Sequence, residues 1–271
     1  MTTSLSDCGL YQVFDEDARA VRHGCDQEWY GTEWQRLSGC GPTTVCNLLW
    51  YLSRTRPAFG LDRKLAGKKD LQAFMEDVWQ YVTPTRRGIP TTRLLYESAL
   101  AYARARNLKF APRVCDVPEK TADRPAWDDV VGFLNDALAQ NLPVAFLNLC
   151  NGDEKELDPW HWVTVISLER ATDGARAWIS VLDGGAVKRS DLSLWFRTTS
   201  RGGGFVFFSS PTTHSSHGRV TRAVPPAPTP GAQAPSSQAR RRSSSRAHPG
   251  YPPPAGAAGR SCNPPPVPAP A

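Results

Sequence analysis

The chain has 271 residues, of which 40% are hydrophobic, and it contains nine tryptophans. This is enough apolar material for one large domain or two small ones. No stretch approaches the roughly 18 consecutive apolar residues of a membrane helix, and the N-terminus lacks the basic and then apolar start of a secretory signal. These observations exclude fibrous and membrane-spanning classes, and we expect a cytoplasmic protein without a membrane span.

The positive charge is concentrated near the C-terminus. Residues 211–271 contain 15 of the 24 prolines and seven arginines but no lysine or acidic residue, so the net charge of +6 leaves −1 on residues 1–210. We therefore predict one folded domain over 1–210 and a disordered tail over 211–271, because the tail cannot bury enough apolar area to offset its ordering entropy. Nucleic-acid binding is not expected of the folded part. The run RRRSSSR at 240–246 leaves open an RNA contact or phosphorylation, although a solvated tail is the simpler interpretation and a reading-frame error would give the same composition.

The seven cysteines predict neither a disulfide framework nor a metal site. Their number is odd and no C-x-x-C pair occurs, and without an export signal we expect reduced thiols. His23, Cys25, Cys40 and Cys46 lie close in sequence, but their spacing fits none of the usual zinc patterns. No metal and no cofactor are therefore expected.

The first half of the chain is predicted to be mainly helical. Residues 1–38 have weak periodicity and are expected to form loops and a short strand. Apolar residues repeating at i, i+3, i+4 and i+7 then predict helices at about 42–53, 70–82, 91–106 and 127–141. Pro42 suits the first position of its helix because it lacks an N–H group, and Asp70 is expected to be the N-cap of the next helix.

The second half is predicted to be mainly strands. Runs rich in β-branched and aromatic residues favour strands at 143–150, 160–168, 177–182 and 204–209, with 110–117 as a further candidate. Helices followed by strands are typical of an α+β domain. We expect N-terminal helices packed on a C-terminal antiparallel sheet.

The sequence Gly39-Cys40-Gly41-Pro42 contains the most informative cysteine. A helix N-terminus favours the thiolate, which is the nucleophilic form of the side chain. The two glycines would let a substrate backbone approach without meeting a Cβ. An inert buried cysteine is the alternative interpretation.

A nucleophilic thiol needs a base, and His161 is the preferred candidate. It opens the predicted strand WHWVTVISL, between Trp160 and Trp162, which are expected to border the substrate. His23 lies in a charged stretch without an element to orient it, so we expect it to be exposed.

Pairing of the next two strands predicts the partner of His161. A three-residue hairpin loop over 172–174, with glycine in the left-handed position, is a common type. It would pair Val165 with Val181 and Leu168 with Trp178, and it would place Asp183 diagonal to His161 on one face of the sheet. Asp158, in a polar loop, is the alternative and is more simply a solvated carboxylate.

Acyl chemistry also requires hydrogen-bond donors for the oxyanion. The backbone N–H of Cys40 is one candidate. Gln35, five residues before the cysteine, is the preferred side-chain donor, and Gln27 is the alternative.

Taken together, these residues resemble the papain-like cysteine peptidases over about residues 25–209. The motifs follow in this order: a glutamine, then GCGP opening a helix, then HWVTV on a strand, then Asp-Gly-Gly at the end of the next strand. This order is most similar to the bacterial branch of the family that includes bacteriocin-leader peptidases. The resemblance implies a papain-like α+β fold, with Cys40 as nucleophile, His161 as general base and acid, Asp183 as its orienting group and Gln35 as oxyanion donor. The family glutamine usually stands six residues before the cysteine. This chain also has neither a membrane transporter nor a Walker motif, so leader cleavage during export is not implied.

The expected function is thiol-dependent hydrolysis of a peptide or amide bond in a peptide or protein substrate. Three alternatives remain. The same chemistry supports acyl transfer to an amine. The domain would instead be a binding module if it lacked turnover, or an RNA-associated protein if the tail directed its function.

Overall fold

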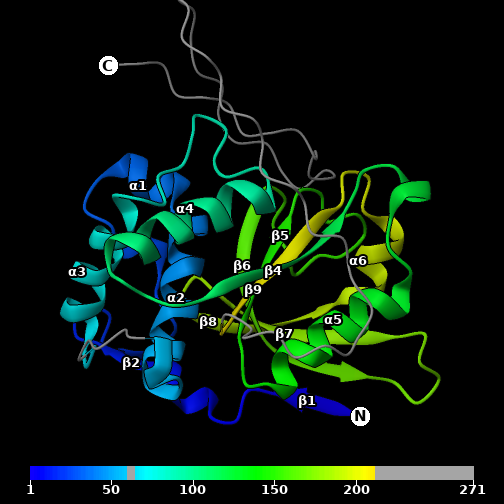
Figure 1. The fold of residues 1–271 in the computed structure, drawn as a ribbon, viewed down its shortest axis with the longest axis horizontal. Helices are drawn as coiled ribbons and strands as arrows, with labels where there is room; N and C mark the ends of the chain where they lie inside the picture. The colour runs from blue at the N-terminus through cyan, green and yellow to red at the C-terminus, as the bar shows by residue number, and fades with distance from the viewer. Residues whose placement is uncertain (60–64, 211–271) are drawn as a thin grey trace, which may run out of the picture. The chain divides into compact units, whose positions relative to one another are not determined.

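The computed structural model describes residues 1–59 and 65–210, and the predicted disordered tail lies outside these residues (Figure 1). The helices are α1 (Glu33–Ser38), α2 (Cys40–Thr55), α3 (Lys68–Trp79), α4 (Thr92–Ala105), α5 (Trp127–Ala139) and α6 (Leu192–Thr198). The strands are β1 (Thr2–Ser4), β2 (Gln12–Asp15), β3 (Ala20–His23), β4 (Ala111–Val117), β5 (Val144–Asn148), β6 (His161–Arg170), β7 (Ala177–Asp183), β8 (Ala186–Asp191) and β9 (Gly203–Ser209). The chain is thus a mixture of helices and antiparallel sheet, which confirms the α+β class.

The main sheet places β6 at its centre. The strands follow the order β4-β9-β5-β6-β7-β8, all neighbours are antiparallel, and β1 pairs with the end of β6 beyond β5. Strands β2 and β3 form a separate hairpin. Strand β6 begins at His161, which pairs with Asn148 of β5, while the pairing of β6 with β7 begins at Thr164.

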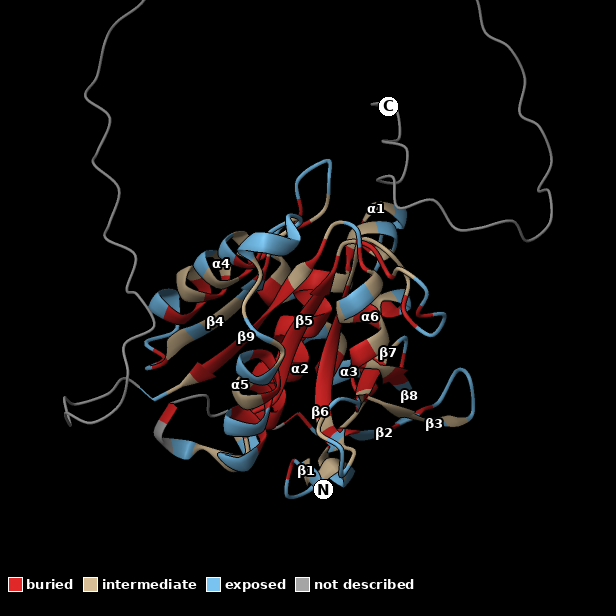
Figure 2. Ribbon diagram, turned by 90° about the vertical axis from the view of Figure 1, so that its right-hand side faces the viewer, coloured by how far each residue is buried: buried red, intermediate tan, exposed pale blue. Residues whose placement is uncertain are grey.

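The core is built between the sheet and α2. Residues 41–52 of α2 are all buried, as is every position of β5. Helices α2 and α5 both contact β5, and because side chains alternate between the faces of a strand, burial at every position means that both faces are covered. Figure 2 shows the buried α2, β5 and β6 in the middle of the domain.

The long helices were predicted with small errors at their ends. Helix α2 begins at Cys40 rather than at Pro42, so the cysteine occupies the first helical turn. Helix α3 begins at Lys68 with Gly67 as its N-cap. Asp70 is therefore not the N-cap, but its carboxylate accepts the N–H of Ala66 at 3.1 Å and still satisfies a donor just before this helix.

Several short elements were not predicted. Residues 1–38 contain β1, the β2–β3 hairpin and α1 rather than loops with one short strand, and β8 and α6 follow β7. Helices α5 and α6 lie between strands along the chain, and β1 joins the main sheet. The expected division into N-terminal helices and C-terminal strands is therefore only approximate.

The hairpin of β6 and β7 differs from its predicted register near the turn. Val165 pairs with Val181 as predicted, but Leu168 pairs with Ile179, and Trp178 faces Glu169. The loop is longer than predicted, since Arg170 and Ala177 are the last pair. A bulge between Val165 and Ser167 compensates for this difference and restores the predicted register at the His161 end of the strand.

Candidate active site

Cys40 stands at the junction of two helices. Helix α1 ends at Ser38, Gly39 is the N-cap of α2, and the half-buried Cys40 is its first residue. A Cβ on Gly39 would lie 2.5 Å from the carbonyl oxygen of Gln35, and one on Gly41 would lie 2.8 Å from Ile89. Both glycines are buried, so the missing Cβ atoms make room for the protein itself. Gly39 and Gly41 are therefore not open to a substrate in the way we expected.

The structure brings Cys40, His161 and Asp183 together. His161 Nε2 lies 2.7 Å from Oδ1 of Asp183, and the same ring hydrogen-bonds the sulfur of Cys40. Because Nε2 is used by Asp183, the nitrogen facing the sulfur is Nδ1. A thiol, an imidazole and a carboxylate are thus arranged in a row, which is the order that a nucleophile, a base and a group orienting the base would need.

The charges of this row favour an ion pair of thiolate and imidazolium. Burial raises the pKa of Cys40, but the hydrogen bond and the charge of His161, together with the backbone N–H groups of Trp162 and Gly41, outweigh it, and the pKa is lowered. Burial lowers the pKa of His161, but the hydrogen bonds and charges of Asp183 and Cys40 raise it to about 10. The thiol and the imidazole therefore stabilise each other's charged forms.

Lys188 is a further charged group in this row that sequence reasoning missed. The two-glycine turn after Asp183 folds β8 back along β7, and Lys188 Nζ lies 2.6 Å from Oδ2 of Asp183. Burial raises the pKa of Asp183, but His161 and Lys188 together lower it to about 2. The carboxylate is thus held by a different partner on each oxygen.

The two candidate glutamines occupy different places. Gln35 forms a capping box with Thr32, and its Nε2 donates to Glu76 at 2.6 Å. Gln27 lines a narrow crevice together with Cys40, His161 and Asp183, whereas Gln35 is absent from the described lining of that crevice. The amide of Gln35 thus serves the start of α1, whereas Gln27 lines the crevice with Cys40 and its Nε2 also donates to the carbonyl oxygen of Arg36 at 3.0 Å.

Asn47 connects the segments that form the crevice. It lies seven residues after Cys40 on α2 and is buried. Its Oδ1 accepts the N–H of Cys25 at 2.8 Å, and its Nδ2 donates to the hydroxyl of Thr164 at 3.3 Å. One side chain thus ties the loop that carries Gln27 to the helix of Cys40 and the strand of His161.

Two cavities meet at Cys40 and Trp162. The crevice next to His161 has a volume of about 10 Å³, which is the room of one water-sized group. The second cavity has a volume of about 140 Å³ and is bordered by both Trp160 and Trp162. Its size suits a side chain, and its position beside the sulfur suits a substrate. Both tryptophans thus line a cavity that Cys40 also lines, and their contact with a substrate stays a prediction.

Trp160 has an unusual backbone conformation. Its φ is +58°, a left-handed value that costs a bulky residue energy and is often found at functional sites. The guanidinium of Arg201 lies 5.5 Å from its ring centroid. The conformation positions the ring at the cavity, next to His161.

The other histidine and carboxylate considered from the sequence lie elsewhere. His23 ends strand β3 and is half-buried rather than exposed in a loop, and its N–H donates to Gly185. Asp158 accepts a hydrogen bond from Asn148 through its backbone oxygen. Neither residue belongs to the described lining of the crevice.

The remaining cysteines differ from Cys40. Cys8, Cys25, Cys46 and Cys115 are free thiols, and burial is the main cause that raises the pKa of each of them. Cys150 is disulfide-bonded, so the expectation of reduced thiols throughout is wrong for this residue. Among the free thiols of the described residues, only Cys40 has a lowered pKa.

In residues 1–59 and 65–210, no three histidine, cysteine or acidic side chains gather into a possible metal site. No helix in this part of the chain has the length and apolar character needed to cross a membrane.

Comparison with solved structures gives distant likenesses. No protein-family model and no curated protein matches the chain. The crystal structure of UfSP from C. elegans is similar with a TM-score of 0.44 and 12% identity, over 78% of this chain and 35% of that chain. The chain thus spans about a third of the length of that protein. Neither family nor activity follows from this similarity.

Proposed function

We propose that the chain is a papain-like cysteine peptidase or amidase that hydrolyses a peptide or amide bond. The observation that carries the proposal is the row in which Asp183 lies 2.7 Å from His161 Nε2 while the same imidazole hydrogen-bonds Cys40. This row is assembled from the first turn of α2, the start of β6 and the end of β7. All three groups are half-buried, and a cluster of titratable side chains with shifted pKa values is typical of a functional site.

In the first half of the reaction, the Cys40 thiolate attacks the carbonyl carbon and a carbon–sulfur bond forms. The negative charge moves to the carbonyl oxygen, which the N–H of Cys40 and the amide of Gln27 would stabilise. His161 then gives its proton to the leaving nitrogen as the carbon–nitrogen bond breaks.

In the second half, His161 takes a proton from water, and the resulting hydroxyl group attacks the thioester. The carbon–sulfur bond breaks, the acid leaves, and the thiolate and imidazolium are restored. Asp183 keeps the imidazole oriented and stabilises its positive charge throughout. The cycle consumes one water molecule for each bond that is hydrolysed, and it needs no oxidant or reductant.

The test compares two cysteines in the full chain. A peptide-like epoxide should label Cys40, and mass mapping should find no label on Cys8. Hydrolysis of a mixed peptide library should disappear in Cys40→Ala and persist in Cys8→Ala. Turnover in Cys40→Ala near that of the unmodified chain would exclude Cys40 as the nucleophile.

A further inference from the structure

The larger cavity beside Cys40 has a charged rim. It is lined by Trp34, Leu37, Ser38, Cys40, Arg86, Arg87, Gly88, Ile89, Pro90, Leu147, Leu149, Trp160 and Trp162. We refer to it as the arginine-rimmed pocket. Its lining is apolar except for the two arginines and a few small polar groups, and no acidic residue belongs to its described lining.

The two arginines are presented by a short, well-bonded turn. The backbone of Thr85 and Gly88 exchanges two hydrogen bonds, at 3.0 and 2.9 Å. The Thr85 hydroxyl also donates to the carbonyl of Gly88 and accepts the N–H of Arg87. Arg86 and Arg87 are therefore the two central residues of a turn that leaves little backbone freedom.

This turn is attached to the wall of the pocket. The residue after it is Ile89, whose carbonyl accepts the indole N–H of Trp162 at 2.7 Å. Trp162 follows His161 on β6 and is buried. The arginines thus have a fixed place relative to His161, and binding there requires little reordering of the backbone.

The positive charges of the two arginines are not paired with a carboxylate in the described part of the chain. Both side chains are exposed, and neither forms an ion pair with another described residue. Arg201 adds a third positive charge close to the pocket through its contact with Trp160. Residues 1–210 carry a net charge of −1, so this local positive potential contrasts with the rest of the domain.

We propose that this pocket selects substrates in which an apolar side chain lies next to a carboxylate. The apolar side chain would fill the cavity between the tryptophans, and Arg86 and Arg87 would bind the carboxylate. Guanidinium groups match carboxylates in shape and form paired hydrogen bonds with them. This inference rests on the proposed function, since the pocket is assigned to the substrate of Cys40.

The experiment uses peptide epoxides that alkylate Cys40 in the full chain. Three probes share one phenylalanine and differ in a neighbouring glutamate, glutamine or lysine. A fourth carries the glutamine but ends in a free carboxylate instead of an amide. The second-order rate of Cys40 modification, followed by mass mapping, measures the preference. Comparison of the first and fourth probes separates an acidic side chain from a chain end as the source of the carboxylate.

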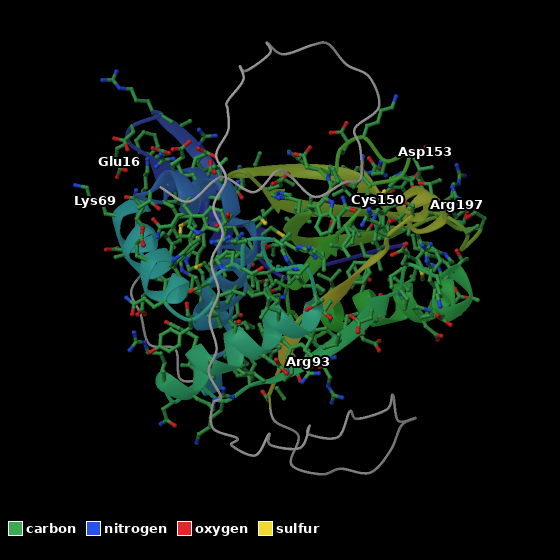
Figure 3. The ribbon with its side chains drawn as sticks, turned by 90° about the horizontal axis from the view of Figure 1, so that it is seen from above. Glu16, Lys69, Arg93, Cys150, Asp153 and Arg197 are labelled. Carbon is green, nitrogen blue, oxygen red and sulfur yellow. The ribbon has the colours of Figure 1, made fainter. Side chains whose placement is uncertain are left out.

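The variants are matched in charge. Arg86→Glu with Arg87→Glu reverses the rim, and Lys69→Glu with Arg197→Glu makes the same change at two exposed positions that lie at opposite edges of the domain in Figure 3. The unmodified chain and the control should react with one of the carboxylate probes about 5- to 10-fold faster than with the neutral probe. The rim variant should lose or reverse this preference. Arg86→Gln with Arg87→Gln provides a milder form if the reversal affects folding.

Iodoacetamide, which is small and neutral, separates failure of this inference from failure of the proposed function. Rapid iodoacetamide labelling of Cys40 without any preference for a carboxylate probe would overturn the inference and leave the thiolate chemistry intact. A preference that survives in both rim variants would also overturn it. Slow labelling of Cys40 by every reagent would overturn the proposed function itself.

Discussion

Lys188 Nζ lies 2.6 Å from Oδ2 of Asp183, the carboxylate oxygen that His161 does not contact. Lys188 sits on β8 and does not reach the sulfur, so any influence on the reaction must pass through Asp183 and His161. We assign it a positioning role. It keeps the carboxylate ionised and leaves one oxygen free for the imidazole.

Replacement of Lys188 by Met should therefore change the acid side of the pH profile. Without the ammonium group, the pKa of Asp183 rises from about 2 towards its ordinary value, so the carboxylate becomes neutral at higher pH and the imidazolium loses its partner there. We expect turnover to fall about fivefold, the size of a half-exposed ion pair, and the acid limb to shift upwards. Lys188→Arg should restore the turnover rate and the position of the acid limb. An unchanged pH–rate profile in Lys188→Met would contradict the positioning role of Lys188.

The lowered pKa of Cys40 predicts unusual reactivity below pH 7. At pH 6, iodoacetamide should modify Cys40 much faster than the half-buried Cys8, whose pKa is raised by burial and Asp7. In His161→Ala the thiol loses the hydrogen bond and the charge that lower its pKa, so labelling at pH 6 should slow by at least about tenfold. Rates resolved for each cysteine by mass mapping would check this. Equal rates for Cys40 in the two proteins would argue against the ion pair.

The same ion pair fixes the alkaline limit of turnover. The pKa of His161 is raised to about 10, so the imidazolium persists at neutral pH and is lost as the pH rises through that value. Hydrolysis requires this proton for the leaving group. We therefore expect a plateau that extends well above pH 7 and falls near pH 10 in a pH–rate profile. A fall centred near pH 6.5, the ordinary histidine value, would show that Asp183 and Cys40 do not stabilise the charged ring.

The pairing of β6 with β7 shows what the sequence could and could not predict. Strand positions followed from residue type, and proximity of Asp183 to His161 followed from an assumed turn. Next to the turn, the pairing of β6 with β7 is shifted by one residue from the predicted register. This shift alone would move Asp183 to the other face of the sheet. The bulge at Ile166 reverses that shift. Nothing in the residue pattern identifies this bulge, so the correct placement came from two errors that cancel.

The hydrogen bonds of Gln35 could have been predicted from the sequence. Thr32 and Gln35 have the spacing of a capping box, and recognising it would have predicted α1 and assigned the amide of Gln35 to that helix. The position of Gln27 could not be predicted in this way. The Gln27 side chain donates to the carbonyl of Arg36, and Asn47 links the nearby Cys25 to a helix and a strand that are distant in sequence.

The two glutamines should respond differently to replacement. Gln27→Ala should lower kcat by about 100-fold, the usual effect of removing one oxyanion donor, while iodoacetamide labelling of Cys40 stays the same because alkylation forms no oxyanion. Gln35→Ala should lose the capping box and the contact with Glu76, costing about 1 kcal/mol of stability, with little change in kcat. Steady-state kinetics and denaturant unfolding of both variants would decide. The reverse pattern would return the oxyanion role to Gln35.

Asn47 offers the sharpest test of how the site is held together. Asn47→Ala removes the acceptor of the Cys25 N–H and the donor to Thr164, and both lie in buried surroundings. We expect a loss of about 2–3 kcal/mol in the free energy of unfolding, together with slower turnover at temperatures well below the midpoint, because the Gln27 loop is released from α2. Asn135→Ala is the matched control: this exposed residue accepts only the hydroxyl of Thr3 in the described hydrogen bonds, and it should cost less than about 0.5 kcal/mol. If Asn47→Ala is destabilised but turns over at the normal rate when fully folded, Asn47 supports the fold without positioning Gln27.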